Sequence, residues 1–126
     1  MPKRAIIAGQ AAPAGGPYSH AVVAGDTIYL AGAVPARPDG TRETGSFAAQ
    51  AHAAFRQLAA TAAAAGSSLD QAVRVGVYLR DWANFAEMNE IYQEYIKGPD
   101  LPVRTTLPVP LVNMEIEVDA VLYTGP

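Results

Sequence analysis

Three acidic residues and one arginine near the end of the chain have the types and spacing needed for proton chemistry on a carboxylate substrate. Glu115, Glu117 and Asp119 alternate with apolar residues, so in a strand their carboxylates share one face. If the segment around Arg104 is also a strand and pairs with them as a hairpin, its guanidinium lies close to this acidic row. Such an arginine can hold a substrate carboxylate, while a neighbouring carboxylate moves a proton or orients water.

Each of these groups also has a purely structural interpretation. Most arginines are structural, and Arg104 could simply form a surface ion pair. The acidic row could be the solvated outer face of an edge strand. Spacing alone leaves the structural and the functional interpretations open.

The two histidines, His20 and His52, do not form a metal site by spacing, and no metal ligand set is predicted. His52 is expected on the polar, solvated side of a helix. His20 follows a Gly-Pro-Tyr-Ser segment at residues 16–19, but nothing in the sequence supports a serine–histidine nucleophile pair. The Gly15-Gly16 pair lacks the spacing of a phosphate-binding or dinucleotide-binding loop.

Length and composition favour a single domain over residues 1–126. Half of the residues are hydrophobic, the net charge is −3 and there is no cysteine. Disulfides, thiolate nucleophiles and cysteine-ligated metals are therefore excluded. The negative charge disfavours broad binding to nucleic acid or to an anionic membrane surface. Without a recognisable signal or membrane-spanning run, a soluble cytoplasmic protein is expected.

Hydrophobic periodicity predicts two helices and six strands. One helix runs from an N-cap at Ser46 to a stop at Gly66, and the other runs from Asp81 to Gly98. The strands are predicted over residues 5–8, 18–24, 27–31, 72–79, 104–109 and 114–123. The order β-β-β-α-β-α-β-β indicates an α+β fold, with both helices on one face of a mostly antiparallel sheet.

Two of the predicted strands are apolar on both faces. Residues 28–30 read Ile-Tyr-Leu and residues 77–79 read Val-Tyr-Leu, whereas two helices can cover only one face. The open face is most economically buried against other subunits. The chain is therefore expected to associate with further copies of itself through this face.

Five motifs in this order resemble the RidA (YjgF) family over nearly the whole chain, from about residue 5 to residue 123. They are GPYS at 16–19, IYLAG at 28–32 followed by Pro35, FAEMNEIY at 85–92, PVRTT at 102–106 and IEVDAV at 116–121. The resemblance implies a chorismate-mutase-like fold, a homotrimer with a site at each interface, and no cofactor or metal. It also implies hydrolysis of reactive 2-enamine and 2-imino acids, such as 2-aminoacrylate and 2-iminopropanoate, to a 2-keto acid and ammonia. This activity limits damage by reactive metabolites.

The resemblance also assigns roles to residues of this chain. Arg104 matches the arginine that grips the substrate carboxylate, and Tyr18 and Asn89 match residues that line the pocket. Glu117 matches the acid that positions or activates water. Glu115 is an alternative acid on the same strand face, although aligning on it requires a larger deletion.

Two positions depart from the pattern of many deaminating members. Ala31 replaces a serine before Gly32, and Thr106 replaces a cysteine two residues after Arg104. The backbone amides of Gly32 and Thr106 could still stabilise a polar intermediate. These departures bear on substrate preference and rate rather than on carboxylate binding.

Two other functions compete with imine hydrolysis. A non-catalytic trimer that binds small carboxylates as a regulator would use Arg104 equally well, and it would bind imino or keto acids without accelerating deamination. An endoribonuclease is disfavoured by the acidic charge and by the lack of a basic, aromatic face. The expected partners are thus a small imino acid and further copies of the chain.

Overall fold

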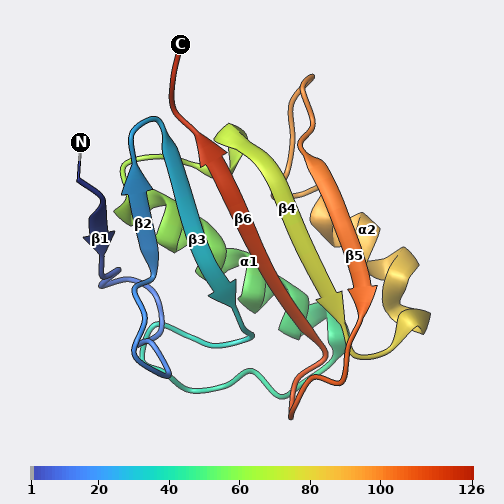
Figure 1. Cartoon of the computed structure of the whole chain (residues 1–126). Helices are drawn as coiled ribbons and strands as arrows, with labels where there is room; N and C mark the ends of the chain where they lie inside the picture. The colour runs from blue at the N-terminus through green and yellow to red at the C-terminus, as the bar shows by residue number, and fades with distance from the viewer. Residues whose placement is uncertain (1) are drawn as a thin grey trace.

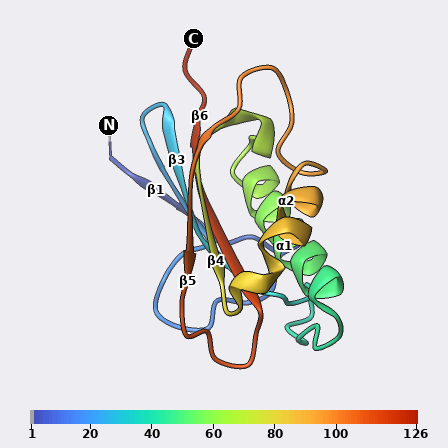
Figure 2. The same ribbon diagram turned by 90° about the vertical axis from the view of Figure 1, so that its right-hand side faces the viewer.

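A six-stranded sheet with both α-helices on one face makes up this chain, which we describe over residues 2–126 of a computed structural model (Figures 1 and 2). The strands are β1 (Arg4–Ile6), β2 (Ala21–Ala24), β3 (Thr27–Ala33), β4 (Ala72–Leu79), β5 (Val103–Pro108) and β6 (Ile116–Tyr123). Their spatial order is β1-β2-β3-β6-β4-β5, and every neighbouring pair is antiparallel except β4 and β5. The predicted α+β class and the order of helices and strands are confirmed.

The predicted hairpin between the arginine strand and the acidic strand is wrong. β4 lies between β5 and β6, parallel to the first and antiparallel to the second. The reason is the helix between β4 and β5, which makes a crossover and brings β5 back parallel to β4 at the sheet edge. Only the other side of β4 then remains for β6.

Helix α1 (Phe47–Ala64) follows its predicted boundaries. The Ser46 hydroxyl accepts a hydrogen bond from the Ala49 amide at 3.2 Å, and Gly66 ends the segment with a φ of +83°. Fully buried alanines such as Ala51 and Ala54 let the helix lie close against β3 and β6.

The second helix is shorter than predicted. Asp81 accepts a hydrogen bond from the Ala83 amide at 2.9 Å, but this cap starts a short 3-10 helix (Trp82–Asn84). The α-helical part, α2, covers only Phe85–Tyr92, and the chain then turns toward Gly98. Trp82 lies in this 3-10 helix and is 47% exposed.

Two strands differ from their predictions in detail. β4 has a register shift between Ala72 and Arg74, so Val73 is exposed instead of facing the core. β2 begins at Ala21 rather than at residue 18, because Tyr18 closes a turn on the Gly16 carbonyl.

The core lies between the sheet and the helices. The apolar residues of β6 alternate inward as predicted, with Ile116 and Val118 fully buried. The opposite face of the sheet has no helix on it, as Figure 2 shows, and it carries large side chains such as Tyr29, 53% exposed. Within residues 2–126, no helix has the length and apolarity to cross a bilayer.

Candidate active site

Tyr18, Gly32 and Glu117 come together on the open face of the sheet, and we call these three residues the acid half. Tyr18 belongs to the loop before β2, Gly32 to β3 and Glu117 to β6, and all three line one open cavity. β3 pairs with β6 only up to Leu30 and again at Ala33, so the strand is irregular at Gly32. This irregularity leaves the space that the Glu117 side chain occupies.

Glu117 is the only one of the three predicted acids without a partner among residues 2–126. Asp119 accepts hydrogen bonds from Arg74 at 3.2 Å and from Tyr78 at 3.1 Å. Glu115 lies 3.6 Å from Arg80 in an ion pair just before β6 begins. A carboxylate without a protein partner is available to hold water, so the geometry favours Glu117 over Glu115.

The environment of Glu117 suits it to accept a proton. Burial raises the pKa of Glu117, and the negative charge of Asp119 raises it further. The positive charge of Arg42 opposes both effects without cancelling them. A carboxylate with a raised pKa is a stronger base than an ordinary glutamate.

Replacing Gly32 by alanine is expected to impair the acid half without unfolding the protein. A methyl group there would collide with the Glu117 carboxylate, which is the movable end of a flexible side chain. The carboxylate should therefore swing away, lowering turnover about tenfold, while the melting temperature changes little. Gly9→Ala is the matched control, because a methyl group at Gly9 meets nothing within 4 Å. Equal activity of the Gly32→Ala and Gly9→Ala variants would show that the position of Glu117 is unimportant.

Arg104 lies in the opposite part of the molecule, against the aromatic side chains of α2. Its guanidinium carbon is 4.8 Å from the centroid of the Tyr92 ring and 5.7 Å from that of Phe85. Burial raises the pKa of Tyr92, and the charge of Arg104 acts in the opposite direction. Among residues 2–126 no carboxylate pairs with Arg104, which is only half-exposed. The ring faces hold the cation in place but do not neutralise it.

Asn89 and Thr106 complete what we call the arginine half, which consists of Arg104, Asn89 and Thr106. Asn89 is four residues after Phe85 and three before Tyr92, so it shares their face of α2. Thr106 follows Arg104 by two residues in β5 and therefore points to the same side of the sheet. Both residues are half-exposed.

The two halves do not meet within one chain. Arg104 is opposite the buried Val75 and so faces the helices, whereas Glu117 is opposite Tyr78 on the open face. β5 and β6 are also two strand spacings apart, about 10 Å. The structure therefore brings together Tyr18, Gly32 and Glu117, and separately Arg104, Asn89 and Thr106.

His20 holds the loop that carries Tyr18. Its Nδ1 accepts a hydrogen bond from the Ala8 amide at 3.0 Å, and its Nε2 lies 2.7 Å from the Ala12 carbonyl. An acceptor at one nitrogen and a donor at the other require the neutral ring protonated on Nε2. His20 is therefore a structural residue. His52, expected on the solvated side of the helix, is half-buried, and its Nδ1 lies 2.7 Å from the Tyr95 hydroxyl.

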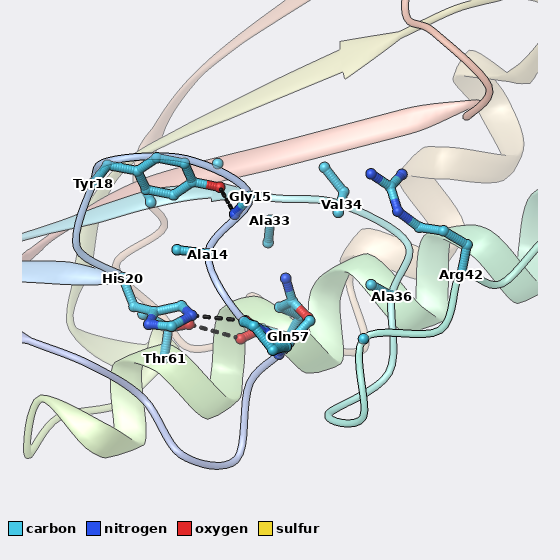
Figure 3. Close-up of a pocket in the computed structure, with 15 residues that line it drawn as sticks. Ala14, Gly15, Tyr18, His20, Ala33, Val34, Ala36, Arg42, Gln57 and Thr61 are labelled. Atoms are coloured by element: carbon cyan, nitrogen blue, oxygen red, sulfur yellow. Dashed lines mark hydrogen bonds between the residues drawn. The ribbon is translucent and has the colours of Figure 1, made fainter.

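A second cavity adjoins the acid half. It has a volume of about 250 Å³ and shares Tyr18 and Gly32 with the first (Figure 3). Sequence reasoning missed one charged residue of its lining, Arg42, because a lone arginine in a Pro/Gly-rich loop carries no motif. Residues 2–126 contain no group of three or more histidine, aspartate and glutamate side chains placed to hold a metal ion.

Comparisons with known proteins match this arrangement to one family. The Endoribonuclease L-PSP family model matches residues 9–123. The chain belongs to this family, the RidA/YjgF family. It is 35% identical over 127 residues to the 2-iminobutanoate/2-iminopropanoate deaminase of Mus musculus, covering 98% of this chain and 93% of that protein.

Other relatives carry different names. A RutC family protein of Pyrococcus abyssi is 36% identical over 126 residues, covering 98% of both chains. The crystal structure of RidA from the Antarctic bacterium Psychrobacter is similar with a TM-score of 0.89 at 32% identity, covering 95% of this chain and 98% of that chain. The family therefore includes members named as imine deaminases and members named otherwise.

Proposed function

We propose that this protein hydrolyses 2-imino acids, and their enamine tautomers, to 2-keto acids and ammonia. The observation that carries the proposal is a pair of unmatched opposite charges, Glu117 on the open face and Arg104 at the β5 edge, each without an ion-pair partner among residues 2–126. Relatives named as imine deaminases support the same reaction.

The complete site is formed between two copies of the chain. In a head-to-tail arrangement, the unpaired Arg104 at the sheet edge of one copy can meet the unpaired Glu117 on the open face of the next copy. Such a contact closes into a ring when the rotation between copies is suitable, and three copies make the smallest cyclic ring above a dimer. The ring gives each site Arg104 from one copy and Glu117 from the next.

In this site Arg104 grips the substrate carboxylate through two parallel hydrogen bonds and fixes the imine carbon above Glu117. Glu117 takes a proton from water while the water oxygen bonds to the imine carbon, and this proton passes to the nitrogen to give a tetrahedral carbinolamine. Glu117 then takes the hydroxyl proton and passes it to the nitrogen, so the C–N bond breaks, ammonia leaves and the C–O bond becomes a carbonyl. One imine and one water thus give one keto acid and one ammonia, with no redox change.

We expect the protein to sediment as a trimer at micromolar concentration. The exposed apolar and aromatic groups of the open face, among them Tyr29 and Leu107, would be buried on association. Sedimentation equilibrium measures the mass directly. A folded, stable monomer at these concentrations would remove the shared site altogether.

Turnover is tested with imines generated in situ. An amino-acid oxidase with catalase converts alanine or 2-aminobutyrate to the imino acid, and keto-acid release is followed with and without this protein. We expect acceleration above the uncatalysed rate. A protein that binds the keto acid but gives no acceleration is a small-carboxylate binder, and RNA cleavage without imine turnover would indicate a ribonuclease.

A further inference from the structure

We propose that Arg42 selects imino acids that carry a second, distal carboxylate, so that the preferred substrates derive from acidic amino acids. This inference rests on the proposed function, since it names the substrate class of the same site. It concerns a residue outside the two halves described above.

Arg42 stands at the cavity that continues from the acid half. The cavity of about 250 Å³ is lined by Arg42 together with Tyr18 and Gly32. In Figure 3 the Arg42 side chain extends away from α1. Arg42 and Val34 line the same cavity, and Val34 lines the Glu117 cavity as well. Arg42 is also close enough for its charge to lower the pKa of Glu117.

The loop that presents Arg42 is held in place by its own hydrogen bonds. Ala36 and Arg42 form a β-bridge, and the Glu43 amide donates to the Pro35 carbonyl at 2.9 Å. Arg37 donates to the Arg42 carbonyl at 2.9 Å and forms an ion pair with Glu43 at 2.9 Å. The backbone at Arg42 is therefore fixed.

The two arginines of this loop have different environments. The guanidinium of Arg37 is occupied by Glu43 and by the backbone. The guanidinium of Arg42 makes no hydrogen bond or ion pair with any residue in the range 2–126, so its five donors remain for a ligand. A planar guanidinium matches a carboxylate through two parallel hydrogen bonds.

A second donor lies at the same cavity. The Tyr18 hydroxyl accepts a hydrogen bond from the Gly15 amide at 3.2 Å, which leaves its own proton to donate. With the imine carbon at Glu117, a substrate side chain that enters the adjoining cavity meets Tyr18 and Arg42. A negative group there would be repelled by Glu117 alone, and Arg42 supplies the opposite charge.

The test compares imino acids of similar length that differ in distal charge. Imines are generated from glutamate and from methionine with oxidases that accept each, and kcat/KM is measured for both. We expect the wild type to prefer the glutamate-derived imine. In Arg42→Gln the ratio of the two kcat/KM values should fall about tenfold or more, the loss of one charge-assisted contact. Arg42→Lys should retain part of the preference for the glutamate-derived imine, because lysine keeps the positive charge.

Lys97→Gln is the matched control, because it removes one positive charge from an exposed position away from the cavity. It should leave the ratio unchanged. Two results would overturn the inference while imine hydrolysis stands. One is a wild type that does not prefer the glutamate-derived imine. The other is a ratio of the two kcat/KM values that is the same in Arg42→Gln as in the wild type. An equal fall for both substrates also overturns it and assigns Arg42 to the charge balance of Glu117.

Keto-acid binding separates this inference from the proposed function. Calorimetry with 2-oxoglutarate and 2-oxobutanoate needs no turnover. If no imine is hydrolysed but 2-oxoglutarate binds the wild type about tenfold more tightly than Arg42→Gln, the acid-selective site stands and deamination fails. If no imine is hydrolysed and Arg42→Gln also binds 2-oxoglutarate as tightly as the wild type, the acid-selective site and the deamination both fail.

Discussion

Replacing Arg104 by alanine is expected to lower kcat/KM for imine hydrolysis by about a hundredfold to a thousandfold, the usual effect of removing one partner from a desolvated charge pair. The substrate carboxylate would then face two aromatic rings with no cation between them. Steady-state kinetics with an alanine-derived imine measures the change. Arg104→Lys keeps the charge but not the two-point geometry, so it should retain only part of the activity.

The control for Arg104 is another arginine. Arg80 forms an exposed ion pair with Glu115 at the end of β4, and Arg80→Ala should cost little because such pairs contribute about 0–1 kcal/mol. A structural role for Arg104 makes a different prediction, in which Arg104→Ala melts at lower temperature or loses the trimer. If this variant folds, assembles and turns over at the wild-type rate, Arg104 does not hold the substrate.

Replacing Glu117 by glutamine is expected to lower kcat by about a hundredfold to ten-thousandfold, the range attributed to general-base catalysis. The amide has nearly the same shape but accepts no proton. Keto-acid binding, measured by calorimetry, should change little because Arg104 is intact. Glu115→Gln is the matched comparison two residues earlier in the chain, and a larger loss of kcat there would assign the base to Glu115.

The Glu117→Gln variant should not lose stability at neutral pH. Burial and Asp119 raise the pKa of Glu117 above its value in the unfolded chain. The folded state therefore binds this proton more tightly, and the ionised carboxylate opposes folding at pH above the folded pKa. Glu117→Gln should melt at the same or a higher temperature than the wild type at pH 7, and this gain should vanish as the pH falls below the unfolded pKa. A lower melting temperature at pH 7 would show that the carboxylate stabilises the fold.

The raised pKa of Glu117 should also make the activity of the wild type fall as the pH is lowered below neutrality. A general base must be ionised, and the raised pKa of Glu117 places the loss of activity closer to neutrality than an ordinary glutamate would.

Much of the fold followed from local signals in the sequence. The Ser46 cap and the Gly66 stop lie where the helix begins and ends, and the alternation along residues 116–122 correctly separated Glu117 from the buried Ile116 and Val118. Strand pairing was harder, because periodicity gives the faces of a strand but not its neighbours. The insertion of β4 between β5 and β6 follows from the crossover through α2.

The sequence provided candidate site residues but not their arrangement in space. Type and spacing indicated Arg104 and three acids, and the family resemblance then pointed to Glu117. Arg104 and Glu117 nevertheless lie on opposite faces of the sheet. The ion pair of Glu115 with Arg80, which leaves Glu117 as the acid without a partner among residues 2–126, could not be inferred from the sequence. Arg42 was missed because the cavity that it lines is formed by residues distant in the sequence.

Complementation between inactive variants tests most directly whether the site is shared between copies. Arg104→Ala and Glu117→Gln are mixed in equal amounts, unfolded together and refolded, and imine hydrolysis is measured. In a head-to-tail trimer every mixed ring contains one site with both Arg104 and Glu117 intact. Random mixing should then restore about one quarter of wild-type activity, since three rings in four are mixed and each has one intact site of three. A mixture of folded trimers that stays as inactive as its two components would contradict the shared site.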